Sequence, residues 1–323
     1  MAVWAGFWVL GVIWGASFLL IKIGVAEFTP LQLVAVRVTV AAVAMTLTLI
    51  LMKIRFPRDR ASLLGLLVVG TFNTAVPFFL ITWGEQSIDS GLATVLNSTV
   101  PLFSLVIAHF ALVDERITPF KVAGLAVGFV GVVVLTSRSI GVTTDGGNSI
   151  PGQVAVLVAS LCYAATTVFV RRNLRHLKPL VVSGGALISA SIIMLTVSLL
   201  VDGPPRFGEI SGGITAAVLV LGLVNTYIAY LLFYWIIDQW GATRATLVTY
   251  VMPPVGLALG VIFLGESLDA SLIAGAVLIG AGVALVNWRR AQPAPTGENP
   301  AAGEAAGVPE VADVQAQPTT ARR

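Results

Sequence analysis

The chain has 323 residues, of which 57% are hydrophobic and 11% charged, and its mean hydropathy is +0.93. Because about a quarter of the residues in soluble domains are charged, this composition excludes a soluble protein and indicates a polytopic membrane protein. The formal net charge is +3, but the cations form short clusters beside apolar runs, as topology signals do, so nucleic acid is not an expected partner. With Cys162 as the single cysteine, an intramolecular disulfide and a cysteine metal cluster are excluded.

Apolar runs long enough to cross a bilayer occur ten times, since a helix needs about 20 residues to span the ~30 Å hydrocarbon core. We expect spans at residues 3–23, 31–52, 62–83, 91–112, 118–137, 151–171, 180–201, 212–237, 243–264 and 270–288. Lipid offers the backbone no hydrogen-bond partners, and continuous apolar runs lack the alternation of barrel strands, so all ten are predicted to be helices. The first run lacks a basic leader and is interpreted as an uncleaved span.

Lysine and arginine residues predict the orientation of the chain. With the N-terminus taken as cytoplasmic, the outer segments contain only Lys22, Arg138 and Arg206. The inner segments contain Lys53, Arg55, Arg58, Arg60, Arg116, Lys121, Arg171, Arg172, Arg175, Lys178, Arg244, Arg289 and Arg290. We therefore predict a multi-pass protein of the cell membrane (inner or plasma membrane) with both termini in the cytoplasm.

A stretch in the third and fourth spans returns later in the chain at an interval of 152 positions. Gly70, Asn73, Thr74, Trp83, Ala93, Thr94 and Pro101 recur as Gly222, Asn225, Thr226, Trp235, Ala245, Thr246 and Pro253. After a slip of one residue, Glu115, Gly124 and Gly131 recur as Glu266, Gly275 and Gly282. Chance matches in apolar sequence would pair mostly Leu, Val and Ala, so shared Asn, Trp, Pro and Glu indicate a duplication.

Five spans in each half force the second half to enter the membrane upside down. The predicted fold is therefore an all-α bundle of ten transmembrane helices, built as two inverted five-helix repeats. Inverted repeats of this kind place a substrate site near the membrane midplane between the halves, with alternating access by rocking of one half against the other. The predicted divisions are a first repeat at 1–137, a Gly-rich outer linker at 138–150, a second repeat at 151–290 and a disordered cytoplasmic tail at 291–323.

Polar and aromatic residues inside the spans are the candidate substrate-binding residues, because lipid disfavours polar groups. Stripes at helical spacing run along the third and eighth spans, and further polar groups lie on the fourth and ninth. The candidates are Trp14, Asn73, Thr74, Phe78, Thr82, Asn97, Ser98, Asn225, Tyr227, Tyr230, Tyr234 and Tyr250. For a single Ser, Thr or Asn the alternative is a hydrogen bond that joins two helices, worth about 0.6 kcal/mol on average.

Ionisable residues within the spans are few. Arg37 lies in the second span, where burial at the centre would cost roughly 2.5–3.5 kcal/mol. It is expected to reach the outer headgroups or pair with Glu27, or else to bind an anion. His109, near the inner end of the fourth span, is either a proton carrier or a structural residue. Acidic residues such as Glu85 and Glu266 fall at span ends, so no midmembrane acid indicates proton coupling, and facilitated exchange remains open.

Small residues line one face of the fifth and tenth spans, at Gly124, Gly128, Gly131, Gly275, Gly280 and Gly282. Such faces permit close helix packing, and a dimer contact is the alternative, so the chain is expected to be a monomer or a homodimer. The sequence has no phosphate-binding loop, no His/Cys cluster and no nucleophile elbow. We therefore predict no enzyme activity, no cofactor and no metal.

Several short motifs resemble those of the drug/metabolite transporter superfamily, in its EamA-type ten-helix branch with two repeats. They are Trp14-Gly15-Ala16-Ser17-Phe18, Pro30 and Arg37, and Glu115 and Glu266, each followed by a Gly-bearing span. The resemblance covers about residues 3–288. It implies export of a small metabolite, amino acid or drug through a central cavity lined by spans one, three, four, six, eight and nine. In the second half Cys162-Tyr163 takes the Trp-Gly position, which adds Tyr163 to the candidates, and no arginine corresponds to Arg37.

Three functions are compatible with these features. A secondary transporter, with a small-molecule substrate and the lipid bilayer as partners, follows from the inverted repeat and the paired polar stripes. A membrane-embedded enzyme or lipid-handling protein is the alternative suggested by the apolar, tyrosine-rich centre. A non-transporting sensor that uses the tail for interaction is a third.

Overall fold

A computed structural model describes residues 1–111, 118–137, 148–241 and 245–287. The described residues all belong to one compact unit, Met1–Trp288. The tail and most of the predicted linker lie outside the described residues, as do Asp114, Glu115 and Arg116.

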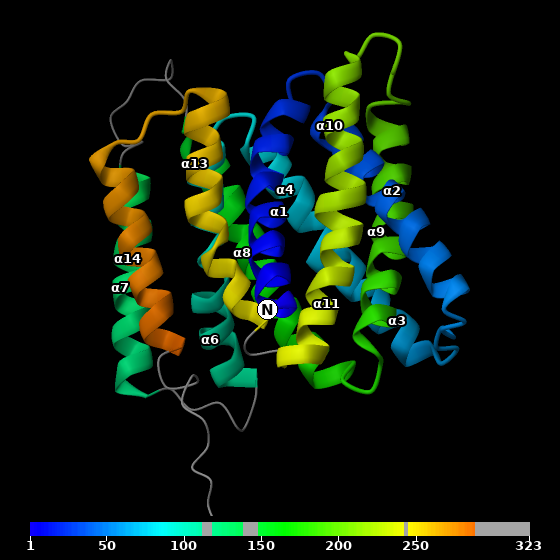
Figure 1. Cartoon of the computed structure of the whole chain (residues 1–323), viewed down its shortest axis with the longest axis horizontal. Coiled ribbons are helices and arrows are strands. Elements are labelled where there is room, and N and C mark those ends of the chain that lie inside the picture. Colours follow the sequence, from blue (N-terminus) through cyan, green and yellow to red (C-terminus); the bar gives the residue numbers. More distant parts are fainter. Residues whose placement is uncertain (112–117, 138–147, 242–244, 288–323) are drawn as a thin grey trace, which may run out of the picture. The chain divides into compact units, whose positions relative to one another are not determined.

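All secondary structure in the described residues is helical (Figure 1). In chain order the elements are α1 (Ala2–Gly24), α2 (Pro30–Leu51), α3 (Arg60–Val69), η1 (Gly70–Ala75), α4 (Val76–Gly84), α5 (Ser90–Asn97), α6 (Val100–Ala111), α7 (Pro119–Ser137), α8 (Ile150–Asn173), α9 (Pro179–Val201), α10 (Gly212–Gly222), η2 (Leu223–Ile228), α11 (Ala229–Trp240), η3 (Thr246–Tyr250), α13 (Met252–Leu264) and α14 (Ala270–Asn287). Counting continuous helical runs within the described ranges, nine are long and apolar enough to cross a membrane, and a shorter apolar run covers Ala270–Val286. The all-helical prediction is confirmed, with span ends that differ from the predicted ones by only a few residues.

Local sequence explains where several helices begin. The side chains of Asp59, Ser149 and Ser211 each accept a hydrogen bond from a backbone N–H in the first turn of α3, α8 and α10, at 2.8, 3.2 and 3.4 Å. These caps satisfy amide groups that have no partner within the helix. Proline occupies an early position of α2, α8 and α9, where its missing N–H does no harm.

The two halves run in opposite directions. Near the end of α1, the Nζ atom of Lys22 donates to the backbone oxygen of Glu85, just after α4, at 2.6 Å. At the start of α8, the backbone N–H groups of Asn148 and Ser149 donate to the oxygen of Ser87, at 2.7 and 3.0 Å. Thus α1 ends at the face where its repeat mate α8 begins, which confirms the predicted inversion (Figure 1).

The halves interdigitate rather than forming two separate bundles. Helices α1 and α2 of the first half pack against α10, η2, α11 and α13 of the second. Helices α8 and α9 pack in the same way against α3, η1, α4, α5 and α6 of the first half. Repeat mates also pack on each other, α2 against α9 and α7 against α14.

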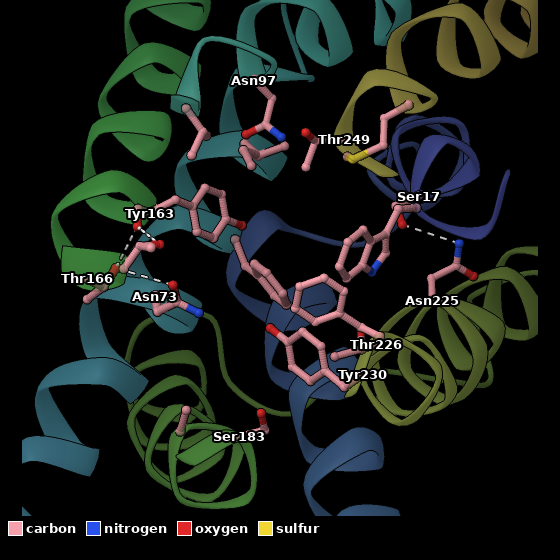
Figure 2. Close-up of a pocket in the computed structure, with 18 of the residues that line it drawn as sticks. Ser17, Asn73, Asn97, Tyr163, Thr166, Ser183, Asn225, Thr226, Tyr230 and Thr249 are labelled. Carbon is pink, nitrogen blue, oxygen red and sulfur yellow. Dashed lines mark hydrogen bonds between the residues drawn. The ribbon is translucent and has the colours of Figure 1, made fainter. Parts of the chain in front are cut away.

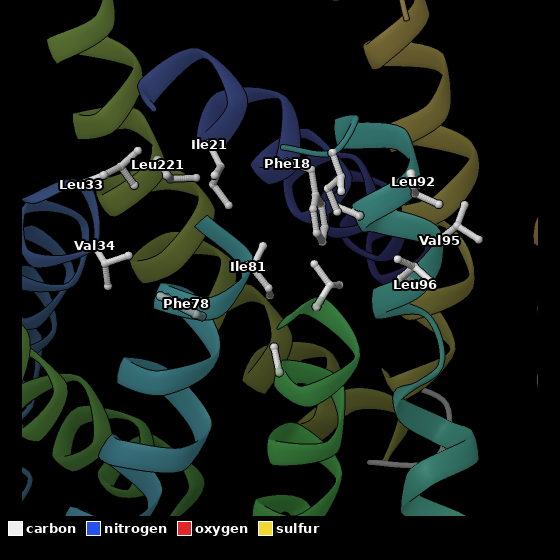
Figure 3. Packing of buried hydrophobic residues seen from close by; sticks show 14 of the residues in the cluster. Phe18, Ile21, Leu33, Val34, Phe78, Ile81, Leu92, Val95, Leu96 and Leu221 are labelled. Carbon is white, nitrogen blue, oxygen red and sulfur yellow. The ribbon is translucent and has the colours of Figure 1, made fainter. Parts of the chain in front are cut away.

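The largest cluster of buried hydrophobic side chains draws on both halves. Figure 3 shows Phe18 and Ile21 of α1 beside Phe78 and Ile81 of α4, with Leu221 of α10 nearby. This apolar packing holds the helices that surround the centre of the bundle.

The predicted glycine faces pack against each other between α7 and α14. A Cβ atom added to Gly124 would lie 2.6 Å from the carbonyl oxygen of Gly282, and one added to Gly131 would lie 2.9 Å from that of Gly275. Backbones this close leave no room for a larger residue. These four glycines serve packing within the chain, as predicted, whereas Gly280 has open space around it.

Candidate transport site

Two π-helical segments occupy corresponding positions in the two repeats. η1 contains Asn73 and Thr74, and η2 contains their repeat mates Asn225 and Thr226. The π-helix is rare and is frequent at functional sites. In η2, the Asn225 amide donates to the backbone oxygen of Ile13 and, at 3.2 Å, to the Ser17 hydroxyl of α1. In η1, the amide oxygen of Asn73 accepts a hydrogen bond from the Thr166 hydroxyl of α8 at 3.2 Å, so each asparagine contacts the first helix of the other half.

A cavity of about 520 Å³ lies at the centre of the described bundle. Its lining comes from α1, α2, α3, η1, α4, α5, α6, α8, α9, η2, α11, η3 and α13. Figure 2 shows Tyr163, Asn73 and Thr166 on one side of it and Ser17, Asn225 and Tyr230 on another. The volume is in the range of small-molecule sites.

Most of the candidate residues line this cavity. Those present are Trp14, Arg37, Asn73, Phe78, Asn97, Ser98, Tyr163, Asn225, Tyr230 and Tyr234. They come from helices that are far apart in sequence and are brought together by the interdigitated packing.

Five candidates lie elsewhere. Thr74 and Thr82 are fully buried outside the lining. The hydroxyl of Tyr227 hydrogen-bonds that of Thr48 at 2.6 Å. Tyr250 lines a smaller second cavity and donates to the backbone oxygen of Val283 at 3.0 Å, and His109 contacts Phe110 near the end of α6.

Both π-helical segments contain a candidate that lies outside the lining, Thr74 in η1 and Tyr227 in η2. Thr226, the repeat mate of Thr74, does line the cavity, so the two copies differ at this position. The predicted stripes assumed an uninterrupted α-helix, in which residues four apart share a face.

Several polar lining residues were not among the candidates. Ser17, Thr166 and Ser183 all line the cavity. The hydroxyl of Thr166 lies 3.2 Å from Oδ1 of Asn73, and Ser183 hydrogen-bonds the Tyr234 hydroxyl. Ser183 belongs to α9, a span that the family resemblance does not place at the cavity. Its position in a run of small residues is the only signal that the sequence provides.

Arg37 of α2 is a buried cation at the cavity wall, with 6% of its surface exposed. Its Nε atom donates to the Thr226 hydroxyl at 2.9 Å, and its Cζ atom lies 3.8 Å from the centre of the Phe78 ring, a favourable cation–π geometry. No acidic side chain forms an ion pair with it in the part of the chain that the structure describes. The expected pairing with Glu27 is wrong, because Glu27 instead accepts a hydrogen bond from the backbone N–H of Ser211 at 2.6 Å.

Aromatic rings form another part of the lining. The ring centres of Trp14 and Phe233 are 5.2 Å apart, those of Tyr230 and Tyr234 are 6.5 Å apart, and those of Phe233 and Tyr234 are 5.8 Å apart. Apolar rings with a few oriented polar groups are typical of sites for small molecules. Here the site also offers one guanidinium group without a protein counter-ion among the described residues.

An inverted-repeat helical bundle with a central, mostly apolar cavity defines a membrane transport protein. The model of the EamA-like transporter family matches residues 3–137 and 150–288. The chain therefore belongs to the EamA-like transporter family of the drug/metabolite transporter superfamily, which is a family of transporters and not of enzymes.

Relatives extend over most of the chain. The "Uncharacterized transporter YoaV" of Bacillus subtilis is 26% identical over 84% of this chain and 91% of its own length. The "Uncharacterized inner membrane transporter YedA" of Escherichia coli is 28% identical over 80% of this chain and 82% of its own. The "Probable amino-acid metabolite efflux pump" of Salmonella typhimurium is 28% identical over 84% of this chain and 90% of its own length.

A solved structure, described only as a crystal structure of a protein, has the same fold. It superimposes with a TM-score of 0.63 over 90% of this chain and 98% of its own, at 19% identity. The likeness supports the arrangement of helices.

Proposed function

We propose that this transporter exports small amphipathic solutes that carry a carboxylate, such as amino acids with apolar side chains or related metabolites. The observation that carries the proposal is the Arg37 guanidinium at the cavity wall, with no acidic side chain paired to it in the described residues. Arginine binds a carboxylate through two parallel hydrogen bonds. The Nε atom of Arg37 already donates a hydrogen bond to Thr226, so the two terminal nitrogens are the groups that would bind the substrate carboxylate.

The aromatic and amide side chains of the lining suit the apolar and amino groups of such a solute. Trp14, Phe233 and Tyr230 would pack against an apolar side chain, and Asn73 and Asn97 would hydrogen-bond an amino group or other polar group. The name of the Salmonella typhimurium relative, an amino-acid metabolite efflux pump, agrees with this substrate class.

Transport would follow alternating access, with no ATP-driven motor. Two mixed bundles would move about the cavity: α1 and α2 with the later helices of the second half, and α8 and α9 with the later helices of the first. Both termini would lie in the cytoplasm and the protein in the cell membrane, as the distribution of lysine and arginine predicts.

Ligand-induced thermal stabilisation tests the substrate class, because a ligand that binds only the folded protein raises its stability. A library of amino acids, the amines that share their side chains, and cationic dyes would be added to the purified protein. We expect stabilisation by carboxylate-bearing solutes with apolar side chains. Stabilisation by the amines or dyes, with none by the amino acids, would contradict the proposal.

A further inference from the structure

Glu85 is a buried acid that the proposed transport site does not use. It follows α4 directly, just past the span Arg60–Gly84, and its side chain has no solvent exposure. Neither carboxyl oxygen has a hydrogen-bond partner among the described residues. An ionised carboxylate in such surroundings would lack both water and protein donors, and this costs several kcal/mol, so the neutral acid is favoured. Burial raises the pKa of the Glu85 carboxyl well above its ordinary value, against the opposing effect of Lys22.

The charged groups around Glu85 do not supply a direct partner. Lys22 of α1 directs its ammonium group to the backbone oxygens of Glu85 and Ile88, at 2.6 and 2.8 Å. Arg37 of α2 donates to a threonine hydroxyl instead. These two cations favour the ionised form of Glu85, and the nearby Glu266 carboxylate opposes it. Helix α8, which also packs against α4, carries charged residues only at its opposite end.

Glu266 differs from Glu85 in being well provided with donors. Its carboxylate accepts hydrogen bonds from the backbone N–H groups of Ser90 and Gly91, at 2.7 and 2.9 Å. These groups open α5, and the start of a helix stabilises a negative charge. Both carboxyl oxygens of Glu266 therefore have backbone donors, whereas neither oxygen of Glu85 has a partner among the described residues.

In the sequence, Glu85 lies only a few residues from side chains that line the central cavity. Phe78 and Ile81 of α4 line the cavity, and Ile81 is one helical turn before Glu85. On α1, Ile21 lines the cavity and precedes Lys22. Figure 3 shows Ile21, Phe78 and Ile81 within one apolar cluster. Glu85 itself has no solvent exposure in this arrangement.

We propose that Glu85 is a proton-binding site, and that it must take up one proton from water for this end of the bundle to close. When the end opens, water reaches the carboxyl group and it releases the proton, with no other group changing its charge. The proposal rests on the proposed transport function, because it links each closure during alternating access to a proton. Transport then depends on the pH at the face to which this end opens.

Purified protein tests the site without any substrate. We would measure the melting temperature against pH for the wild type, Glu85→Gln and the control Glu209→Gln, whose side chain is 70% exposed. The stabilisation given by protonated Glu85 is complete below the ordinary glutamate pKa of about 4.3 and is lost as the pH rises through the raised value in the folded protein. We expect the wild type and E209Q to fall progressively below E85Q as the pH rises. Parallel curves for all three proteins would overturn the proposal.

An infrared measurement covers the case in which E85Q does not fold. Wild-type protein at neutral pH should show the carbonyl band of a protonated carboxylic acid, and the band should disappear on titration to high pH. Absence of the band at neutral pH would overturn the proposal.

In proteoliposomes, transport of an amino acid identified by thermal stabilisation should slow as the pH at the opening face rises, and E85Q should lose this dependence. If none of the amino acids is transported, the substrate proposal fails while the melting and infrared results still decide the role of Glu85.

Discussion

Replacement of Arg37 by methionine should separate substrate binding from folding. Methionine has an unbranched apolar side chain, so it would occupy much of the same space without the charge. In the free protein the guanidinium makes one hydrogen bond, to Thr226 at 2.9 Å, and one ring contact, with Phe78 at 3.8 Å. Removal of one partner of a buried ion pair is destabilising because it leaves the other charge unpaired. Arg37 has no acidic partner among the described residues, so R37M should fold as well as the wild type.

Binding should weaken strongly in the same variant. A hydrogen bond to a charged group contributes about 1.5–3 kcal/mol, and about 1.4 kcal/mol corresponds to a tenfold change in Kd. R37M removes both bonds to the substrate carboxylate, and the loss of one alone raises the Kd roughly 10- to 150-fold, so an increase of at least that size is expected. Arg37→Lys keeps the charge but not the planar pair of donors, so it should fall between R37M and the wild type.

Isothermal titration with a stabilising amino acid would give the Kd values, and thermal melting without ligand would give the stability. Arg206→Met is the matched control, because Arg206 is a surface residue with 79% of its side chain exposed. An R37M protein that binds the amino acid as tightly as R206M does would refute the role of Arg37. A large loss of stability without ligand would show instead that Arg37 is a structural residue.

Two further predictions concern packing and the cavity wall. Gly124→Ala should lower the free energy of unfolding by about 1–3 kcal/mol, as overpacking does, because the new Cβ would lie 2.6 Å from the backbone of α14. Gly280 has open space around it, so Gly280→Ala should leave the free energy of unfolding, measured by reversible unfolding, almost unchanged. Tyr230→Ala and Asn97→Ala should weaken ligand binding more than Gly128→Ala does. Equal loss of folded protein in these three variants would mean that both side chains serve packing.

The fold could be predicted because the bilayer imposes a simple constraint. A segment that crosses lipid must satisfy its own backbone, so apolar runs alone predict the helices and their ends. Repeated Asn, Trp and Pro residues predicted the duplication, and the odd number of spans predicted its inversion. Hydropathy does not say which helix packs against which. The packing of α1 against helices of the second half, and of α8 against helices of the first, was therefore not predictable.

The cavity was only partly predictable, for reasons that particular residues illustrate. Thr74 and Tyr227 have the right spacing for an α-helix, but both lie in π-helical segments and neither lines the cavity. Glu85 sits at a span end, where the sequence indicates contact with water, yet it has no solvent exposure. Lys22 hydrogen-bonds the backbone of the turn that contains Glu85, and the backbone N–H groups at the start of α8 donate to the oxygen of Ser87. Such contacts between distant segments leave no pattern in the local sequence.

Transport in proteoliposomes tests the central claim most directly. Vesicles that contain the purified protein would be loaded with an unlabelled amino acid with an apolar side chain, and entry of the labelled form would be followed beside that of the amine with the same side chain. The account predicts rapid exchange of the amino acid, little movement of the amine, and loss of the exchange in R37M. Equal movement of the amino acid and the amine, or movement of neither above that in vesicles without protein, would contradict it.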